Sequence, residues 1–306
     1  MVNRQRFLVR FWGVRGSYPT PGPQTLRYGG NTSCVEVLAG SHILVFDAGS
    51  GIIRLGQDLL QRAGGKDLDL TLFLTHAHGD HLIGFPFFAP LFSPRTRLHL
   101  IGPQLAGLDI EQILTSVMSP PYFPVDVRQL PSQRTYHTIT DEQRVSWLSG
   151  SENSELIIDL PVTGRVQPGA PAELCVEAKF TQSHPLNGSI CYRIEYAGRR
   201  VVYATDVEWR NGCDPAFLAF VEGADLLIHD AQYTTPDYQQ QKQGFGHSTV
   251  EMAIETAQIA HVRKLILFHH EPTYDDAQLE RMEAEAQARF PHTRSAREGM
   301  EINLLT

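Results

Sequence analysis

The stretch Thr75-His76-Ala77-His78-Gly79-Asp80-His81 decides how the rest of this sequence is interpreted. It follows the apolar run 70–74, which predicts a buried strand. His76 and His78 are two residues apart on an extended segment, so both side chains can point toward one ion. Asp80 and His81 lie beyond the turn that Gly79 permits, toward a second ion. Imidazole with carboxylate suits zinc, manganese or iron, and the absence of thiolate argues against a closed structural zinc site. The stretch therefore predicts a metal site.

The composition is that of an ordinary globular protein. The chain has 306 residues, of which 42% are hydrophobic and 20% are charged. Its 26 basic and 34 acidic residues give a net charge of −8, which argues against tight non-specific binding to nucleic acid. No apolar run approaches the roughly 18 residues of a membrane helix, and residues 1–10 do not form a signal peptide. Cysteines without paired spacing (Cys34, Cys175, Cys191 and Cys213) fit reduced thiols, so we expect a cytoplasmic protein.

Five predicted strands are each followed by a histidine or an aspartate. They are 70–74, 176–181, 200–204, 224–228 and 264–268, followed in turn by His76, His184, Asp206, His229-Asp230 and His269-His270. A two-layer sheet protein with its site at one rim produces this pattern. Residues 104–119 have helical spacing, and the polar sequence after them offers too little apolar material for a separate core. We therefore expect one domain over 1–306, with a cap or connecting insertion at about 104–171.

The pattern His76-x-His78-x-Asp80-His81 resembles the signature of the metallo-β-lactamase-fold hydrolases. This resemblance implies an α/β fold, an αββα sandwich of two mixed sheets flanked by helices, with a metal site at one edge of the sheets. It also implies two divalent transition-metal ions, zinc in the first place, with manganese or iron as alternatives. Carried over residue by residue, the first ion takes His76, His78, His184 and Asp206, and the second takes Asp80, His81, Asp206 and His269.

Two neighbours of this ligand set need separate treatment. His269 and His270 follow the same strand and face opposite ways, so only one of them is expected to ligate. We favour His269 and keep His270 as the alternative. Asp47 also follows a predicted strand near the same rim. We expect it to hydrogen-bond the backbone of the metal loop or to orient a ligand histidine, rather than to bind metal directly.

Two further motifs point to a branch of the fold. Gly246-His247-Ser248-Thr249 resembles the histidine motif of the tRNA 3′-end endonucleases (the ribonuclease Z group) and of cyclic-phosphate phosphodiesterases. The stretch 227–233 resembles the His-Glu-Ala-Thr stretch of those endonucleases, with Asp230 in place of the glutamate. Residues 248–251 are typical of a capping box, which places His247 at a helix N-terminus, where free N–H groups favour phosphate. We predict that His247 protonates the leaving oxygen and that Asp230 orients the His247 imidazole. The alternative for His247 is a residue that only packs against the cap.

These motifs favour a phosphodiesterase in which a hydroxide held between two ions, about 3.5–4 Å apart, attacks phosphorus. Asp80 would orient this hydroxide while it binds metal. The acidic chain lacks the long base-rich arm of the ribonuclease Z group, so a small or cyclic phosphodiester is expected and a large RNA is disfavoured. The alternatives are a thioester or lactone hydrolase of the same fold and a non-catalytic metal or nucleotide sensor.

The stretches 11–17 and 28–34 resemble a group of bacterial stand-alone hydrolases of this fold. They make Arg15 and Asn31 candidate phosphate contacts. The resemblance also implies a homodimer.

Overall fold

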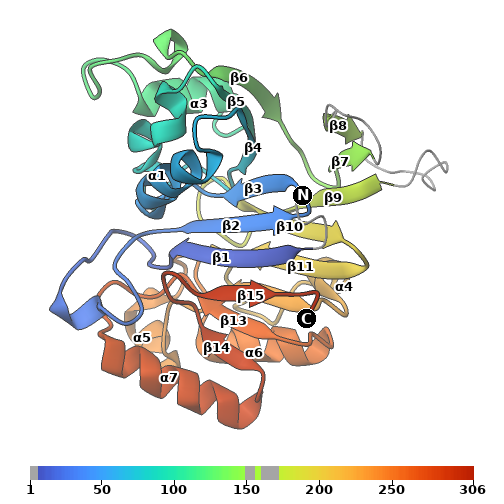
Figure 1. The fold of residues 1–306 in the computed structure, drawn as a ribbon. Helices are drawn as coiled ribbons and strands as arrows, with labels where there is room; N and C mark the ends of the chain where they lie inside the picture. The colour runs from blue at the N-terminus through green and yellow to red at the C-terminus, as the bar shows by residue number, and fades with distance from the viewer. Residues whose placement is uncertain (1–5, 149–155, 160–171) are drawn as a thin grey trace.

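The computed structural model describes residues 6–148, 156–159 and 172–306 (Figure 1). These residues form one seven-stranded and one eight-stranded sheet. The first sheet has the order β15 (Glu301–Asn303), β1 (Phe7–Gly13), β2 (Cys34–Ala39), β3 (His42–Phe46), β4 (Leu68–Phe73), β5 (Thr96–Gly102), β6 (Gln133–Thr138). The second has the order β14 (Thr293–Ser295), β13 (Leu265–Phe268), β12 (Leu226–Asp230), β11 (Arg199–Ala204), β10 (Ser189–Tyr196), β9 (Ala172–Thr181), β7 (Arg144–Leu148), β8 (Leu156–Asp159).

The main hydrophobic core lies between the two sheets. Alternate residues of a strand share a face, so Phe7, Val9 and Phe11 of β1 are all fully buried in this core, together with Tyr203 and Phe268 of the second sheet. A second core lies beneath α1 (Gly51–Ala63) and α3 (Ile110–Val117), which cover the first sheet. A third lies beneath α4 (Pro215–Val221), α6 (Val250–Ile259) and α7 (Asp276–Arg289), which cover the second. Figure 1 shows these helices on the two outer sides, and the predicted αββα sandwich is confirmed.

Strand direction gathers the predicted site residues at one edge. β3 runs parallel to β4, and β11, β12 and β13 run parallel to one another. β9 is antiparallel to β10, which is antiparallel to β11, so β9 points the same way as β11. The N–H of Ile190 donates to the carbonyl of Thr75 at 2.9 Å, and the Tyr192 hydroxyl donates to the carbonyl of Leu74 at 2.7 Å. These bonds join the two sheets at the edge where the metal loop begins.

Several predicted boundaries shift for local reasons. The helix expected over 104–119 is only α3, because Asp109 is its N-cap and accepts a hydrogen bond from the Gln112 N–H. The capping box before α6 is built on Thr249 with Met252, one residue later than expected. β12 ends at Asp230, so that aspartate is the last residue of its strand rather than a residue beyond it.

The predicted insertion at 104–171 includes residues outside the described ranges. Within the described part, β6 extends the first sheet, whereas β7 and β8 extend the second. β1 pairs with β15 in one sheet, with Leu8 opposite Asn303. We therefore keep a single domain over 1–306 as our proposal. In the described residues no helix is long and apolar enough to cross a membrane.

Candidate active site

The metal loop is fixed by one buried aspartate. The loop follows β4 and ends in the single turn of α2 (Gly79–Leu82), which carries Asp80 and His81. The Asp47 carboxylate accepts hydrogen bonds from the Thr75 N–H and from His81 Nδ1, both at 2.8 Å, and from the Tyr203 hydroxyl at 2.9 Å. Asp47 is fully buried and has a φ of 62°. The hydrogen bonds expected of Asp47, to the backbone of the metal loop and to a predicted ligand histidine, are present.

The predicted ligand histidines are held so that one ring nitrogen faces the centre of the site. Nδ1 of His184 donates to the carbonyl of Gly246 at 2.9 Å, and Nδ1 of His269 lies 2.9 Å from Oε1 of Gln232. Nδ1 of His76 lies 3.0 Å from the Thr75 hydroxyl. An Nδ1–H engaged in this way leaves the lone pair on Nε2, which is the arrangement of metal-ligating histidines.

The side chains form two trios around one aspartate. The first contains His76, His78 and His184, and the second contains Asp80, His81 and His269. Oδ1 of Asp206 lies 3.6 Å from Nε2 of His76 and 3.7 Å from Nε2 of His184. Its Oδ2 lies 3.2 Å from Nε2 of His81 and 3.4 Å from Nε2 of His269. Each carboxylate oxygen of Asp206 therefore faces one trio.

Two observations test whether these residues fit metal ions. Nε2 of His76 is buried and has no hydrogen-bond partner, although it points at Asp206 and the other histidines. A buried polar atom without a partner is costly, so a lone pair left open here indicates a ligand. The donors are imidazole nitrogens and carboxylate oxygens, the set that suits zinc, manganese or iron. The two trios are consistent with a dinuclear metal site.

The electrostatics of the cluster point the same way. Burial lowers the pKa of His269, but the carboxylates of Asp206, Asp80 and Asp230 outweigh burial and raise this pKa to about 9. A buried imidazole that favours its charged form reports an excess of negative charge around it. Two divalent cations would neutralise that excess. The pKa of His76 is held well below its usual range by burial and by the neighbouring His81, so this imidazole stays in its neutral, metal-binding form.

The two adjacent histidines lie on opposite sides of the chain. Nε2 of His269 is 3.1 Å from Oδ2 of Asp80, inside the cluster. Nε2 of His270 instead donates to the carbonyl of Ala296 at 3.0 Å, away from the cluster. His269 also packs on the backbone of Gly16, where an added Cβ would come within 2.4 Å of the His269 ring. The residue at position 16 must be glycine for His269 to keep this place.

His247 lies against the cluster and is held by Asp230. Nδ1 of His247 is 2.8 Å from Oδ2 of Asp230, and its ring stacks on His269 with 4.8 Å between centroids. Asp230 is fully buried. Its Oδ1 accepts from the backbone N–H groups of Gln232 at 3.1 Å and Ser248 at 3.0 Å. The structure thus brings together the two side chains that the sequence paired as proton donor and orienting carboxylate.

Three N–H groups directly after His247, which we expected to be free for a phosphate, already have partners. The N–H of Ser248 donates to Asp230, and that of Thr249 is 3.5 Å from the Met252 sulfur. The N–H of Val250 donates to the carbonyl of Tyr233 at 3.2 Å. The expectation of free N–H groups is wrong for these three donors, because each already has a partner inside the protein. Contacts with Asp230 and His269 hold His247 in place instead.

The structure gives Arg15 and Asn31 internal contacts. Arg15 is fully buried, and its guanidinium donates to the carbonyl oxygens of Gly29, Glu271 and Tyr274. Nδ2 of Asn31 donates to Glu298 at 3.1 Å, and its Oδ1 accepts from the Ser50 hydroxyl. Arg15 has no exposed surface for a phosphate, and both polar groups of Asn31 already have partners. Neither residue enters the function proposed below.

Two supporting residues were not assigned a role from the sequence. Gln232 orients His269, and its Nε2 donates to Glu271 at 2.9 Å and to the Ser17 hydroxyl at 3.2 Å. The backbone N–H of Ser17 donates to Oδ2 of Asp80 at 2.7 Å. Ser17 lies in the stretch 11–17 and Gln232 in the stretch 227–233, both of which resemble stretches of known hydrolases of this fold. The Ser17–Asp80 and Gln232–Ser17 contacts join parts of the chain more than 60 residues apart, which no local pattern reveals.

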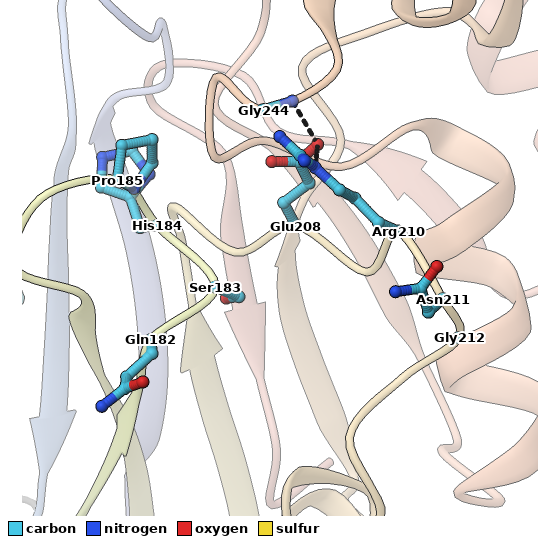
Figure 2. A pocket seen from close by; sticks show the side chains of 9 residues that line it. All are labelled: Gln182, Ser183, His184, Pro185, Glu208, Arg210, Asn211, Gly212 and Gly244. Carbon is cyan, nitrogen blue, oxygen red and sulfur yellow. Dashed lines mark hydrogen bonds and ion pairs between the residues drawn. The ribbon is translucent and has the colours of Figure 1, made fainter.

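A cavity of about 460 Å³ opens beside His184 (Figure 2). Its wall is polar, with Gln182 and Ser183 on one side and Arg210 and Asn211 on the other. Glu208 lies at the inner wall and pairs with Arg210, with Nε and Oε1 2.9 Å apart. Cavities of roughly 300–1,000 Å³ are typical of small-molecule sites. The cavity adjoins the metal cluster through His184.

Comparison with known proteins identifies the family. The family model described as "Beta-lactamase superfamily domain" matches residues 42–270, about three quarters of the chain. The chain belongs to the metallo-β-lactamase superfamily. It is also 28% identical over 318 residues to ribonuclease Z of Thermoplasma acidophilum, an alignment that covers 97% of this chain and 96% of that protein.

Solved structures agree with this fold. The metallo-β-lactamase-fold protein YhfI of Bacillus subtilis aligns with a TM-score of 0.66 at 19% identity, over 97% of this chain and 98% of that one. A diphosphatase of the PhnP family aligns with a TM-score of 0.62 at 16% identity, over 97% of each chain. The motifs predicted a relationship to ribonuclease Z and to phosphodiesterases of the same fold, and the relationship to ribonuclease Z and the PhnP family confirms it. Together with the buried histidine and aspartate trios, it makes the chain a hydrolase of the metallo-β-lactamase superfamily.

Proposed function

We propose that this chain is a metal-dependent phosphodiesterase that cleaves a small or cyclic phosphodiester. One observation carries the proposal: His247 is held by Asp230 at 2.8 Å and stacks on His269 at the metal cluster. An alkoxide leaving from phosphorus needs a proton, and an imidazole in this place can give it. A thiolate leaves without one, so thioester hydrolysis has no use for this pair.

In this proposal the two trios and Asp206 hold two divalent ions. Zinc is our expectation because the donors are imidazole and carboxylate, and manganese or iron are the alternatives. When bound, the ions supply Lewis acidity at the phosphoryl oxygens and a nucleophile derived from water at neutral pH. Asp80 orients the attacking water, because its carboxylate is fixed by the Ser17 N–H and by His269.

The protein's own residues then manage the leaving oxygen. Nδ1 of His247 is engaged by Asp230, so the transferred proton leaves from Nε2. Asp230 accepts from four groups, the other three being the N–H groups of Asp206, Gln232 and Ser248. A carboxylate held by four donors keeps its position, and it therefore fixes the orientation of the His247 ring.

A second candidate is an RNA phosphodiesterase. It is supported by the alignment with ribonuclease Z of Thermoplasma acidophilum, which spans nearly the whole length of both proteins. The net charge of −8 argues against it, because a long polyanion is repelled by an acidic protein. The cavity beside His184 can receive the organic group of a small ester. A cytoplasmic location and a homodimer stay predictions.

A substrate panel tests the proposal. Metal-reconstituted protein should be assayed under one condition with bis(p-nitrophenyl) phosphate, a 2′,3′-cyclic nucleotide, a precursor tRNA, a thioester and a lactone. We expect turnover of the small diesters, loss of turnover on chelation of the metal, and loss in the Asp206→Asn variant. Faster cleavage of the RNA would establish the second candidate. Fast thioester or lactone cleavage without phosphodiester turnover would overturn the proposal.

A further inference from the structure

Glu208 is a buried carboxylate that makes four hydrogen bonds beside the active site (Figure 2). Its Oε1 accepts from the Gly244 N–H and the Tyr238 hydroxyl, both at 2.7 Å, and from Nε of Arg210 at 2.9 Å. Its Oε2 accepts from the Gly246 N–H at 3.0 Å. Three of these donors belong to the segment 238–246, which runs directly into His247. Glu208 itself lies two residues after Asp206, so it ties this segment to the strand end that carries Asp206.

The segment also packs tightly on a predicted ligand. The carbonyl of Gly246 accepts from Nδ1 of His184, while the N–H of the same residue donates to Glu208. Gly246 has a φ of 90°, and a Cβ added there would lie 2.2 Å from Nδ1 of His184 and 2.1 Å from Cδ of Pro185. Gly246 therefore has no room to move toward His184. His184 holds its carbonyl, and Glu208 holds its N–H.

We propose that Glu208 is a positioning residue for proton donation, because it fixes the backbone from which His247 projects. Asp230 holds the His247 side chain, and Glu208 holds the N–H of Gly246, the residue directly before it. This inference rests on the proposed function, in which His247 protonates the leaving oxygen. A shift of about 1 Å in a catalytic group costs on the order of 100-fold in rate, so the backbone bond has a measurable effect.

Glu208→Gln is the informative variant, because only one of its two polar atoms can still accept. An amide oxygen in the Oε1 position keeps the bonds to Tyr238, Gly244 and Arg210, but the NH₂ group then faces the Gly246 N–H, donor against donor. We expect kcat on a methyl phosphodiester to fall roughly 10- to 100-fold. The loss on bis(p-nitrophenyl) phosphate should be less than about threefold, because its leaving group needs no proton.

A double-mutant cycle separates positioning from a general loss of stability. In the His247→Ala background, Glu208→Gln should cost less than about twofold on the methyl diester, because there is no donor left to position. Glu36 supplies the matched control, because it is also a fully buried glutamate and is far from His247 in the sequence. It lies on β2 and accepts hydrogen bonds from Trp12 on β1 and Arg62 on α1. Glu36→Gln should lower thermal stability without any dependence of its rate effect on the leaving group.

Hydrogen exchange gives a readout that needs no turnover. Amides of 243–248 should exchange faster in Glu208→Gln than in wild type, and Glu36→Gln should leave them unchanged. Equal rate losses on the two diesters, or an undiminished loss in the His247→Ala background, would overturn the inference while the proposed function stands. A wild type without phosphodiester turnover would overturn the proposed function and the catalytic role of Glu208 with it. In that case faster exchange would show only that Glu208 orders the segment.

Discussion

Replacing His247 by alanine should separate proton donation from metal chemistry. His247 is mostly buried and belongs to neither trio; it is grouped with Asp206, Asp230 and His269 as a further set of possible ligands, but its Nδ1 is engaged by Asp230 at 2.8 Å. We therefore expect His247→Ala to keep both ions. General acid catalysis contributes about 10²–10⁴-fold, which corresponds to about 2.7–5.4 kcal/mol in the activation free energy. The variant should lose this much activity on an alkyl phosphodiester.

The neighbouring aspartate should show a smaller loss of the same kind. A hydrogen bond to a charged group contributes about 1.5–3 kcal/mol, against about 0.5–1.5 kcal/mol for a neutral one. The His247–Asp230 bond is 2.8 Å long, so changing it from charged to neutral should cost about 1.4 kcal/mol, or about tenfold in rate. Asp230→Asn should therefore lose about tenfold on the alkyl diester, and less on a nitrophenyl diester.

The assay compares kcat for a methyl diester and a nitrophenyl diester at saturating metal, with metal content measured on the same samples. His137→Ala is the control, because His137 lies on β6, where its ring contacts Thr135 and His99 rather than the cluster. It should match wild type on both substrates. If His247→Ala loses the same factor on both diesters, His247 binds substrate rather than donating a proton, and the reasoning above is wrong.

Three other predictions follow from the ligand cluster and its surroundings. His269→Ala should lose one of two ions per chain by elemental analysis, whereas His270→Ala should keep both; the opposite result would reverse their assignment. Gly16→Ala should reduce metal occupancy and activity, because its Cβ meets the His269 ring at 2.4 Å, whereas Gly22→Ala, with no heavy atom within 4 Å, should not. Burial and the charge of Arg15 lower the pKa of His270 to about 3, against about 6.5 in the unfolded chain, so acid favours unfolding. The metal-free protein should therefore lose about 2 kcal/mol of stability between pH 7 and pH 5 through this group, by urea unfolding, and His270→Asn should lack that part of the change.

The fold could be predicted because its signals are local. Apolar runs ending in histidine or aspartate marked β4, β9, β11, β12 and β13, and these strands place the cluster at one edge. α1 likewise ends at a local signal, Gly64, which takes a φ of 57° as its C-cap. Strands with mixed composition were missed. β10 alternates Arg193 and Glu195 with buried Ile194, and its pairing on both sides, rather than its own pattern, makes it a strand.

The predicted ligands share a motif or a strand end, so the sequence could place them. Among the residues that hold the ligands, Asp47 could be suspected because it too follows a predicted strand. Gln232, Ser17 and Glu208 follow no such pattern, and they act through contacts between distant parts of the chain. The prediction that Arg15 contacts phosphate was wrong for a related reason. An arginine in a glycine-rich loop resembles a phosphate contact, and only the folded structure shows that three carbonyl oxygens surround it.

The pairing of β1 with β15 has a consequence for truncated forms of the protein. β1 lies between β2 and β15, and its inward side chains Phe7, Val9 and Phe11 form part of the central core. A fragment that stops before Glu301 would leave one side of β1 with unpaired N–H and C=O groups. Such an edge beside an apolar face is a template for pairing with another chain. Loss of a strand that carries none of the predicted metal ligands would thus make the protein prone to aggregation.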